Sequence, residues 1–283
     1  MKIKDFVFAS RVSEACSLIR EIGDSSYLIA GGTSTFFVSS KNSKVAIDIN
    51  RIPIKGISKN NDIFKIGAGT TINDILKYKA SGWVLDRVAL RHVNQQVRNI
   101  STIGGNIARV FYWSDFPVAL RVLEGTIKLS GISSKTVKIS EAFHNSTVHK
   151  DVFKGSLLEY IEIPEIKKGM GFGYTKESRT SEAFSAATAA AFVKVDDGII
   201  SDARVAIGAV LPFPVRLFDI EEELKGTKAE CLIIRDLNFD RLNKYSLLPR
   251  EGMSMDYCKH LLKVKVSDAI CDALKEAVGG CND

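Results

Sequence analysis

The sequence predicts a protein of mixed α/β or α+β class that is divided into two domains. Three observations support this prediction. The chain has 283 residues, which is long for one domain and comfortable for two. Over residues 1 to about 165, short apolar runs of strand length alternate with amphipathic segments of helical period. The polar, glycine-containing stretch EIKKGM (165–170) then marks a boundary, and an alanine-rich region beyond it leads into a helical tail.

The first part of the chain begins with a helix and short strands. Residues 10–23, SRVSEACSLIREIG, place four apolar side chains on one helical face, and Gly23 can end that helix. Thr71 and Asp74 have capping-box spacing, with Asp in place of the usual Glu, which predicts another helix start. Residues 85–100 predict one longer amphipathic helix. Strands are expected at 27–30, 45–49, 63–69, 126–131, 135–140 and 156–164.

The alanine-rich region after the boundary admits two interpretations. Its alanines favour a helix by propensity, whereas the Asp197-Gly198 pair between two apolar runs favours a β-hairpin. We expect the hairpin, at least around this turn. The tail from FDIEEEL (218–224) onward has helical periodicity, so the second domain is predicted to be a small sheet with helices.

Composition narrows the class of protein. The chain is 45% hydrophobic and 25% charged, as is usual for globular proteins, and no apolar run reaches the roughly 18 residues of a membrane span. Asp5 interrupts the apolar N-terminus, so we expect no signal peptide and a cytoplasmic protein. The net charge of +6 is spread along the chain, which argues against nucleic-acid binding. The cysteines have no CxxC spacing and are expected to be free thiols: Cys16, Cys231, Cys258, Cys271 and Cys281.

Two glycine pairs suggest a binding site for an anion. Gly31-Gly32 follows a predicted strand, and Gly104-Gly105 lies between two predicted helices. Glycine permits positive φ and close approach of a ligand, and successive backbone N–H groups in such turns bind anions. Two facing turns could hold a diphosphate, with the hydroxyls of residues 33, 34 and 102 as further donors. Either pair alone favours a simple turn, because neither matches a Rossmann or P-loop motif. The two hydroxyl-flanked pairs together support a simple turn and a cofactor site equally.

Asp115 has two explanations that are compatible. A helix is expected to begin near Ser114 or Asp115, because Pro117 lies early in it and Gly125 follows its end. A carboxylate at that position is favoured by the helix dipole. It could also accept hydrogen bonds from cofactor hydroxyls, although it would not face a diphosphate directly, since like charges repel.

No histidine lies in a catalytic or metal-binding motif, so we predict neither a catalytic residue nor a metal site in this chain. His144 and His149 flank a polar loop, where a surface role is expected.

Several segments together resemble the FAD-binding medium subunit of the molybdenum hydroxylases, the family of carbon monoxide, nicotinate and xanthine dehydrogenases. The resemblance covers nearly the whole chain. It is carried, in order, by LIAGGTST (28–35), AIDINRIP (46–53), FKIGAGTTINDIL (64–76), QQVRNISTIGGNIA (95–108), SDFPVAL (114–120), SLLEYIEIP (156–164), GYTKESR (173–179) and ARVAIGAVLPFPVR (203–216).

The resemblance implies an α+β fold: a two-subdomain FAD-binding domain of the vanillyl-alcohol-oxidase type, then a small α+β C-terminal domain. The implied boundaries are 1–168, with subdomains of about 1–55 and 56–168, and 169–283. The diphosphate of FAD would lie between two turns, Asp115 would contact FAD hydroxyls, Leu158 would pack near a ring, and Lys176 would lie at the polar edge of the flavin. The resemblance also places His92 where relatives can have an aromatic residue near the flavin ring, although this correspondence is looser than the others. The implied cofactor-binding residues are Ile29, Ala30, Gly31, Gly32, Thr33, Ser34, Thr35, Thr102, Gly104, Gly105, Asn106, Ser114, Asp115, Leu158 and Lys176.

The implied function is that of an electron-transfer subunit. A large molybdopterin-containing chain would hydroxylate the substrate, and a small chain with two [2Fe-2S] clusters would deliver electrons to FAD here. The final acceptor would be NAD, a quinone, ferredoxin or oxygen. The alternatives are a self-sufficient flavin oxidoreductase of the same fold and a non-enzymatic α/β binding module.

The sequence departs from the family pattern in two places. Relatives often carry Asp where this chain has Ser34, and SPxSD where it has Phe111-Tyr112-Trp113-Ser114-Asp115. We expect the three aromatic residues to pack against a partner subunit or the core.

Overall fold

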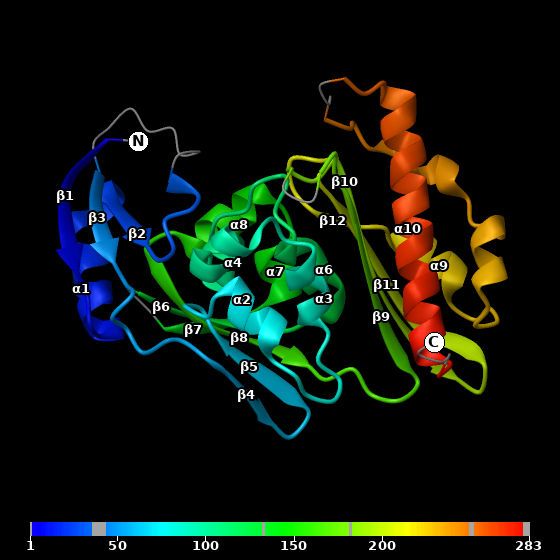
Figure 1. Cartoon of the computed structure of the whole chain (residues 1–283), viewed down its shortest axis with the longest axis horizontal. Helices are drawn as coiled ribbons and strands as arrows, with labels where there is room; N and C mark the ends of the chain where they lie inside the picture. The colour runs from blue at the N-terminus through cyan, green and yellow to red at the C-terminus, as the bar shows by residue number, and fades with distance from the viewer. Residues whose placement is uncertain (1, 36–43, 132–133, 181–182, 249–251, 280–283) are drawn as a thin grey trace. The chain divides into compact units, whose positions relative to one another are not determined.

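The structure of the protein, a computed structural model, describes residues 2–35, 44–131, 134–180, 183–248 and 252–279 (Figure 1). The chain divides into two compact units that are not continuous in sequence. The first unit is Met1–Tyr78, Asn94–Arg109 and Gly125–Pro164; the second is Lys79–Val93, Val110–Glu124 and Glu165–Asp283. Two segments that precede the 165–170 stretch therefore belong to the C-terminal unit.

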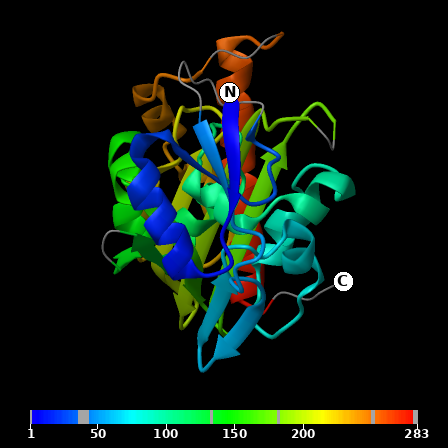
Figure 2. The same ribbon diagram turned by 90° about the vertical axis from the view of Figure 1, so that its left-hand side faces the viewer.

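A small parallel sheet lies at the start of the first unit. Its strands, in spatial order, are β1 (Ile3–Phe8), β3 (Lys44–Asp48) and β2 (Ser26–Ile29). Helix α1 (Val12–Ile22) lies beside these strands and buries Ala15, Cys16 and Ile19 (Figure 2). Gly23 follows the helix with φ of 62°, so it ends the helix as the sequence predicts.

A five-stranded antiparallel sheet forms the rest of the first unit's framework. Its order is β4 (Ile57–Asn60), β5 (Ile63–Gly67), β8 (Ser156–Pro164), β6 (Thr126–Gly131) and β7 (Lys135–Lys138). The unit also holds α2 (Ile72–Lys77), α4 (Gln95–Ile100), α5 (Ile103–Ala108), α7 (Ile139–Ala142) and α8 (Ser146–Phe153). The predicted capping box is confirmed, because Thr71 and Asp74 each cap the other's backbone N–H.

The single helix predicted over residues 85–100 is wrong. The structure has α3 (Leu85–Leu90) and α4 instead, and they belong to different units. The interruption has a local cause: Asn94 has extended backbone, and its side chain accepts a hydrogen bond from the backbone N–H of Val97 at 3.0 Å. Asn94 thus caps α4 and starts a new helix where the apolar periodicity alone suggests continuation.

The second unit contains a four-stranded antiparallel sheet. Its order is β12 (Val215–Arg216), β11 (Ile199–Gly208), β10 (Ala187–Asp196) and β9 (Met170–Glu177). The predicted hairpin is confirmed, since β10 and β11 pair antiparallel across Asp197 and Gly198. These two residues have φ of 51° and 78°, as a type I′ turn requires. The alanine-rich segment is therefore a strand.

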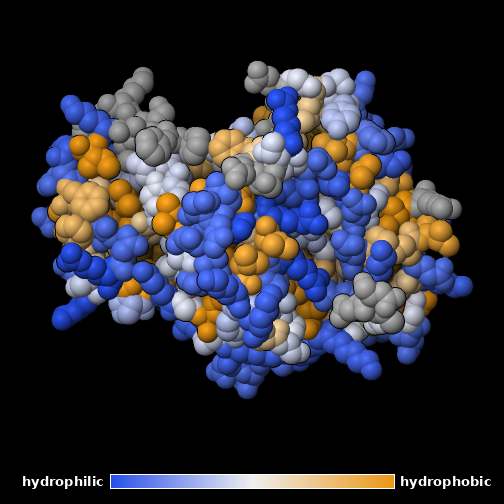
Figure 3. All heavy atoms as spheres, viewed as in Figure 1, coloured by the Kyte–Doolittle hydropathy of each residue, from blue (hydrophilic) through white to orange (hydrophobic). Residues whose placement is uncertain are grey.

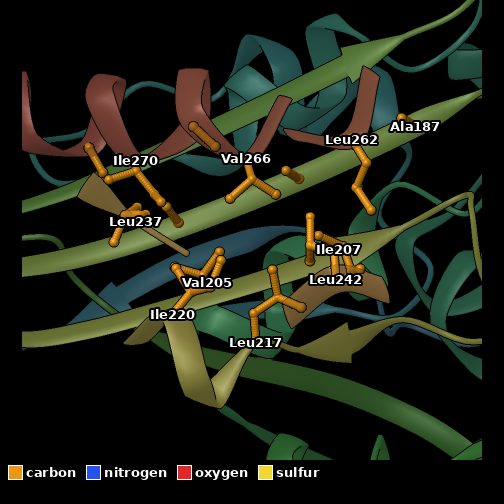
Figure 4. Packing of buried hydrophobic residues seen from close by; sticks show 14 of the residues in the cluster. Ala187, Val205, Ile207, Leu217, Ile220, Leu237, Leu242, Leu262, Val266 and Ile270 are labelled. Atoms are coloured by element: carbon orange, nitrogen blue, oxygen red, sulfur yellow. The ribbon is translucent and has the colours of Figure 1, made fainter. Parts of the chain in front are cut away.

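Helices cover both faces of this sheet. The long helix α10 (Met255–Ala277) packs on β9 and β10, and helix α9 (Phe218–Leu224) packs on β11. Their buried apolar side chains form one core cluster, to which Val266 and Ile270 of α10 and Val205 of β11 belong (Figure 4). Glycines let α10 approach closely, because a Cβ added at Gly171 or Gly173 of β9 would lie 1.9 or 2.0 Å from a carbonyl oxygen of α10. Helix α6 (Phe116–Leu123) contacts β10 and β11, and Val118 of α6 meets Gly208 on the opposite face.

The expectation that all the cysteines are free thiols is wrong for one pair. Cys231, in the 3₁₀ segment η3 (Cys231–Asp236), forms a disulfide with Cys271 of α10, and their Cα atoms are 5.2 Å apart. Sequence spacing could not reveal this contact, because 40 residues separate the two thiols. Cys16 and Cys258 are free and buried, and Cys281 lies outside the described residues.

The surface has the mixed character of an ordinary globular protein. On the face in Figure 3, hydrophobic side chains form small groups among hydrophilic ones. Besides η3, the described residues include the 3₁₀ segments η1 (Gly23–Ser25), which follows α1, and η4 (Phe239–Lys244), which follows η3. Among the described residues, no helix combines the length and the apolar character that a membrane crossing requires.

Candidate functional site

The first glycine pair lies in the loop after β2, where the part of the chain that the structure describes leaves several backbone N–H groups without an acceptor. Gly32 has φ of 68°, in the left-handed region that favours glycine. The N–H of Thr35 closes the turn by donating to the carbonyl of Gly32 at 3.1 Å. The N–H groups of residues 31 to 34 donate to no acceptor among the described residues. Successive free N–H groups around a positive φ form a nest for an anion.

The second glycine pair is not a turn, which corrects the sequence expectation. Gly104 and Gly105 lie in the first turn of α5, and the Thr102 side chain caps this helix by accepting the N–H of Gly105 at 3.1 Å. The N–H groups of Ile103 and Gly104 donate to backbone carbonyls of residues 70 and 68 at 3.0 and 2.8 Å. The chain itself therefore uses these donors, and this segment is not a second nest.

Residues 102–106 provide an amide side chain, that of Asn106, and an exposed glycine, Gly105. The side-chain Oδ1 of Asn106 is buried and accepts no hydrogen bond among the described residues. Gly105 is exposed, and a Cβ added there would meet only Thr102 Oγ1, at 3.2 Å. Gly31 and Gly104, in contrast, are required by close packing of the backbone. A Cβ at Gly31 would lie 1.8 Å from the carbonyl oxygen of Ile100, and one at Gly104 would lie 2.6 Å from the carbonyl oxygen of Ala68.

The structure brings the two glycine segments together. Ser101 Oγ donates to Thr33 Oγ1 at 3.0 Å, and Gly31 packs against the backbone of Ile100. We call residues 29–35 and 102–106 the glycine cradle; both segments belong to the first unit. Leu158 belongs to the same unit, where it is buried in β8, the strand that α5 contacts.

A buried carboxylate organises a second cluster, which lies within the C-terminal unit. Asp115 is 1% exposed and immediately precedes α6. Its Oδ1 accepts hydrogen bonds from Tyr174 Oη at 2.8 Å and Ser185 Oγ at 3.2 Å. Its Oδ2 accepts from His92 Nδ1 at 2.8 Å and Lys176 Nζ at 3.2 Å. We call these five residues the carboxylate cluster.

The fold explains why these side chains converge. Tyr174 and Lys176 are two residues apart on β9, so they project from the same face of the sheet, the face that α6 covers. The sequence suggests two roles for Asp115: the start of a helix and an acceptor of hydrogen bonds from cofactor hydroxyls. It does begin α6, but its side chain makes no capping hydrogen bond. A carboxylate has about four acceptor sites, and four internal donors occupy those of Asp115.

These contacts shift the ionisation of the cluster. Burial alone would raise the pKa of Asp115, but the hydrogen bond from His92, the charge of Lys176 and the hydrogen bond from Tyr174 outweigh it and lower the pKa. Burial, the charge of Asp115 and their hydrogen bond raise the pKa of Tyr174 well above its ordinary value. The cluster therefore holds an ionised carboxylate and a neutral phenol at neutral pH.

The three aromatic residues that depart from the family pattern pack against one another and against Phe184. The Phe111 and Trp113 rings are stacked 4.8 Å apart, and Trp113 also stacks on Phe184 at 4.4 Å. The Tyr112 ring meets Trp113 edge-on. Ser114 is buried, and its Oγ accepts the N–H of Phe111 at 3.0 Å, so it shapes this turn.

The predicted site residues thus fall into two groups. The glycine cradle and Leu158 lie in the first unit, whereas Ser114, Asp115 and Lys176 lie in the second. Sequence reasoning missed Tyr174 and Ser185. The period-2 pattern of GYTKE could have found Tyr174, because it places this residue on the same strand face as Lys176; Ser185 carries no local signal.

Comparison with protein families matches both parts of the chain. The family of the FAD binding domain in molybdopterin dehydrogenase matches residues 2–166. The family of the CO dehydrogenase flavoprotein C-terminal domain matches residues 172–273.

Individual relatives and a solved structure agree with these families. The chain is 30% identical to the glyceraldehyde dehydrogenase medium chain of Sulfolobus acidocaldarius over 82% of its own length and 84% of the relative's. It is 25% identical to the nicotinate dehydrogenase FAD-subunit of Eubacterium barkeri, over 99% and 100% of the two chains. A chain in the structure of carbon monoxide dehydrogenase from Hydrogenophaga pseudoflava superposes with a TM-score of 0.88 at 26% identity, covering 99% of each chain.

Proposed function

Because this chain belongs to the family of FAD-binding medium subunits of the molybdenum hydroxylases, we propose that it is the electron-transfer subunit of a multi-subunit dehydrogenase. A partner chain with two [2Fe-2S] clusters supplies the electrons, and a large molybdopterin-containing chain carries out the hydroxylation. When bound, FAD would supply the chemistry that links single-electron uptake to two-electron release, so that electrons would reach an external acceptor: NAD, a quinone, ferredoxin or oxygen. The names of the relatives support the subunit role, since they are medium chains and FAD subunits of dehydrogenases.

The nest at residues 31–34 is the observation that carries the cofactor assignment. Its four successive N–H groups lack acceptors among the described residues, and they match the negative charge and many oxygens of a diphosphate. On the facing segment, the buried Oδ1 of Asn106 has no partner among the described residues and can accept from a ribityl or ribose hydroxyl. The residues present therefore fit FAD without any Lys or Arg at the diphosphate.

Side chains of the cradle have distinct proposed roles. Thr33 accepts from Ser101 and so keeps its own hydroxyl proton for a phosphate oxygen. Gly105 leaves room for the cofactor at its exposed Cα. Thr102 caps α5, the helix in which Gly105 lies. Leu158 supplies an apolar contact for a ring of the cofactor. We propose residues 1–168 as the FAD-binding domain and 169–283 as the C-terminal domain.

The assignment of Ser114, Asp115 and Lys176 to the cofactor rests on the resemblance alone and stays a prediction. The contacts of Asp115 support a different direct role. Because Lys176, Tyr174 and two other donors occupy the acceptor sites of Asp115, these contacts support a role of the carboxylate in orienting Lys176.

A graded series at Gly105 tests the cradle. We expect Gly105→Ala to weaken FAD binding and Gly105→Val to abolish it, because the new side chain occupies the open face of α5. FAD binding would be measured by flavin fluorescence during titration of the full chain, and folding by thermal denaturation. Ser146→Val places the same side chain at an exposed position of α8 and should leave FAD binding unchanged. Wild-type affinity in a folded Gly105→Val variant would contradict the assignment.

A further inference from the structure

His149 is a buried histidine that the proposed cofactor contacts do not use. The sequence suggests a surface role for it, and that expectation is wrong, because His149 of α8 is only 4% exposed. Its ring contacts the rings of Phe143 and Phe153, with centroid distances of 5.0 and 4.5 Å. His144, at the other end of the loop, is exposed as expected.

The ring nitrogen of His149 contacts the helix that carries half of the glycine cradle. Its Nε2 lies 2.8 Å from the carbonyl oxygen of Ile107 in α5. A carbonyl only accepts, so Nε2 must carry the proton and donate it. Burial lowers the pKa of His149 despite this hydrogen bond, so the ring is neutral at neutral pH and has the Nε2–H tautomer.

The Ile107 carbonyl needs a partner from outside its helix. The last four carbonyls of any helix have no intrahelical donor, and α5 ends at Ala108. The residue that would donate in a longer helix, Phe111, gives its N–H to Ser114 instead. His149 therefore supplies the hydrogen bond that the helix end lacks.

Helix α5 also depends on tertiary contacts more than most helices. It has six residues, two of them glycine, which makes it far too short to form alone. At its N-terminal end, Thr102 and the backbone of residues 68–70 hold it. At its C-terminal end, the His149 hydrogen bond holds the turn in which Asn106 lies.

From these contacts we propose that His149 is a positioning residue for the flavin site, and that it fixes α5 so that Gly105 and Asn106 keep the geometry that receives FAD. The proposal rests on the proposed function for its ligand. Losing the tether lowers the fraction of molecules with a correctly placed α5, and the apparent affinity for FAD falls by the same factor. A buried carbonyl left without its donor predicts a loss of about tenfold.

Three variants of the full chain test this inference. His149→Phe keeps an aromatic ring in contact with Phe143 and Phe153 but removes the N–H. His149→Gln keeps an N–H donor near the position of Nε2. Ile270→Val removes one buried methyl group in α10 of the other unit and controls for general destabilisation. Two quantities would be measured: the FAD dissociation constant by fluorescence, and amide hydrogen exchange of α5 in the absence of FAD.

We expect His149→Phe to raise the FAD dissociation constant and the exchange rates of α5 amides by about the same factor, roughly tenfold. His149→Gln should restore both, and Ile270→Val should change neither. If His149→Phe does not fold, His149→Asn, whose amide is too short to reach Ile107, replaces it. Unchanged α5 exchange together with unchanged FAD affinity would overturn the inference. A wild-type chain that takes up no FAD would instead refute the proposed function, while α5 exchange would still report on the tether.

Discussion

Replacing Asp115 with alanine should destabilise the protein strongly, whatever its effect on FAD. The substitution removes the acceptor of four hydrogen bonds at once. It also leaves the ammonium group of Lys176, whose side chain is 5% exposed, buried without its counter-ion Asp115. A buried cation that loses its partner is far more costly than a lost surface ion pair.

The burial of the ion pair between Asp115 and Lys176 determines the expected loss of stability. Breaking one side of a buried ion pair costs about 3–5 kcal/mol, and each kcal/mol lowers the melting temperature of a chain of this size by about 2–4 °C. We therefore expect Asp115→Ala to melt on the order of 10 °C below the wild type. Asp115→Asn should lose less, because its oxygen can still accept from Tyr174 and Ser185.

Differential scanning calorimetry of the full chain would measure these shifts. The double variant Asp115→Asn with Lys176→Met should cost less than the sum of the single changes, because it removes both charges together. Asp196→Ala serves as the control, since Asp196 pairs with Lys194 at the surface and its loss should barely change the melting temperature. An Asp115→Ala variant that melts within a degree or two of the wild type would refute this account of the carboxylate cluster.

Three further predictions concern the fold. Gly31→Ala should cost about 1–3 kcal/mol in urea denaturation, because its Cβ would lie 1.8 Å from the Ile100 carbonyl oxygen; wild-type stability would contradict that packing. Reducing the Cys231–Cys271 disulfide, which closes a loop of 40 residues, should lower the free energy of unfolding by about 2–4 kcal/mol, and thiol counting that finds no disulfide would contradict it. Since the pKa of Tyr174 is raised by burial and the nearby charge, the unfolded chain loses that proton first; the free energy of unfolding should fall as pH rises above about 10, and Tyr174→Phe should flatten this decline in urea titrations at alkaline pH.

Features with a local cause could be predicted from the sequence. The Asp197-Gly198 hairpin and the capping box at Thr71 depend on residues a few positions apart, and the structure confirms both. The break before α4 also has a local cause, the capping residue Asn94, but the apolar periodicity of residues 85–100 predicts one continuous helix. A capping residue within a run of apolar periodicity therefore indicates a helix boundary as strongly as the periodicity indicates a helix.

Features that depend on distant contacts could not be predicted. The bond from His149 to Ile107 spans 42 residues, and that from Tyr174 to Asp115 spans 59, so no spacing rule connects them. The glycine pair at 104–105 looked like a turn because glycine favours turns. Its helical state depends on the Thr102 cap and on Gly104 packing against the distant Ala68.

We propose that this chain holds the diphosphate of FAD on the nest of residues 31–34. The most direct test is amide hydrogen exchange of the full chain with and without FAD, read residue by residue by NMR. We expect the N–H groups of these four residues, which have no acceptor among the described residues, to become protected when FAD is added. Bound FAD that leaves all four amides as exposed to exchange as before would contradict it.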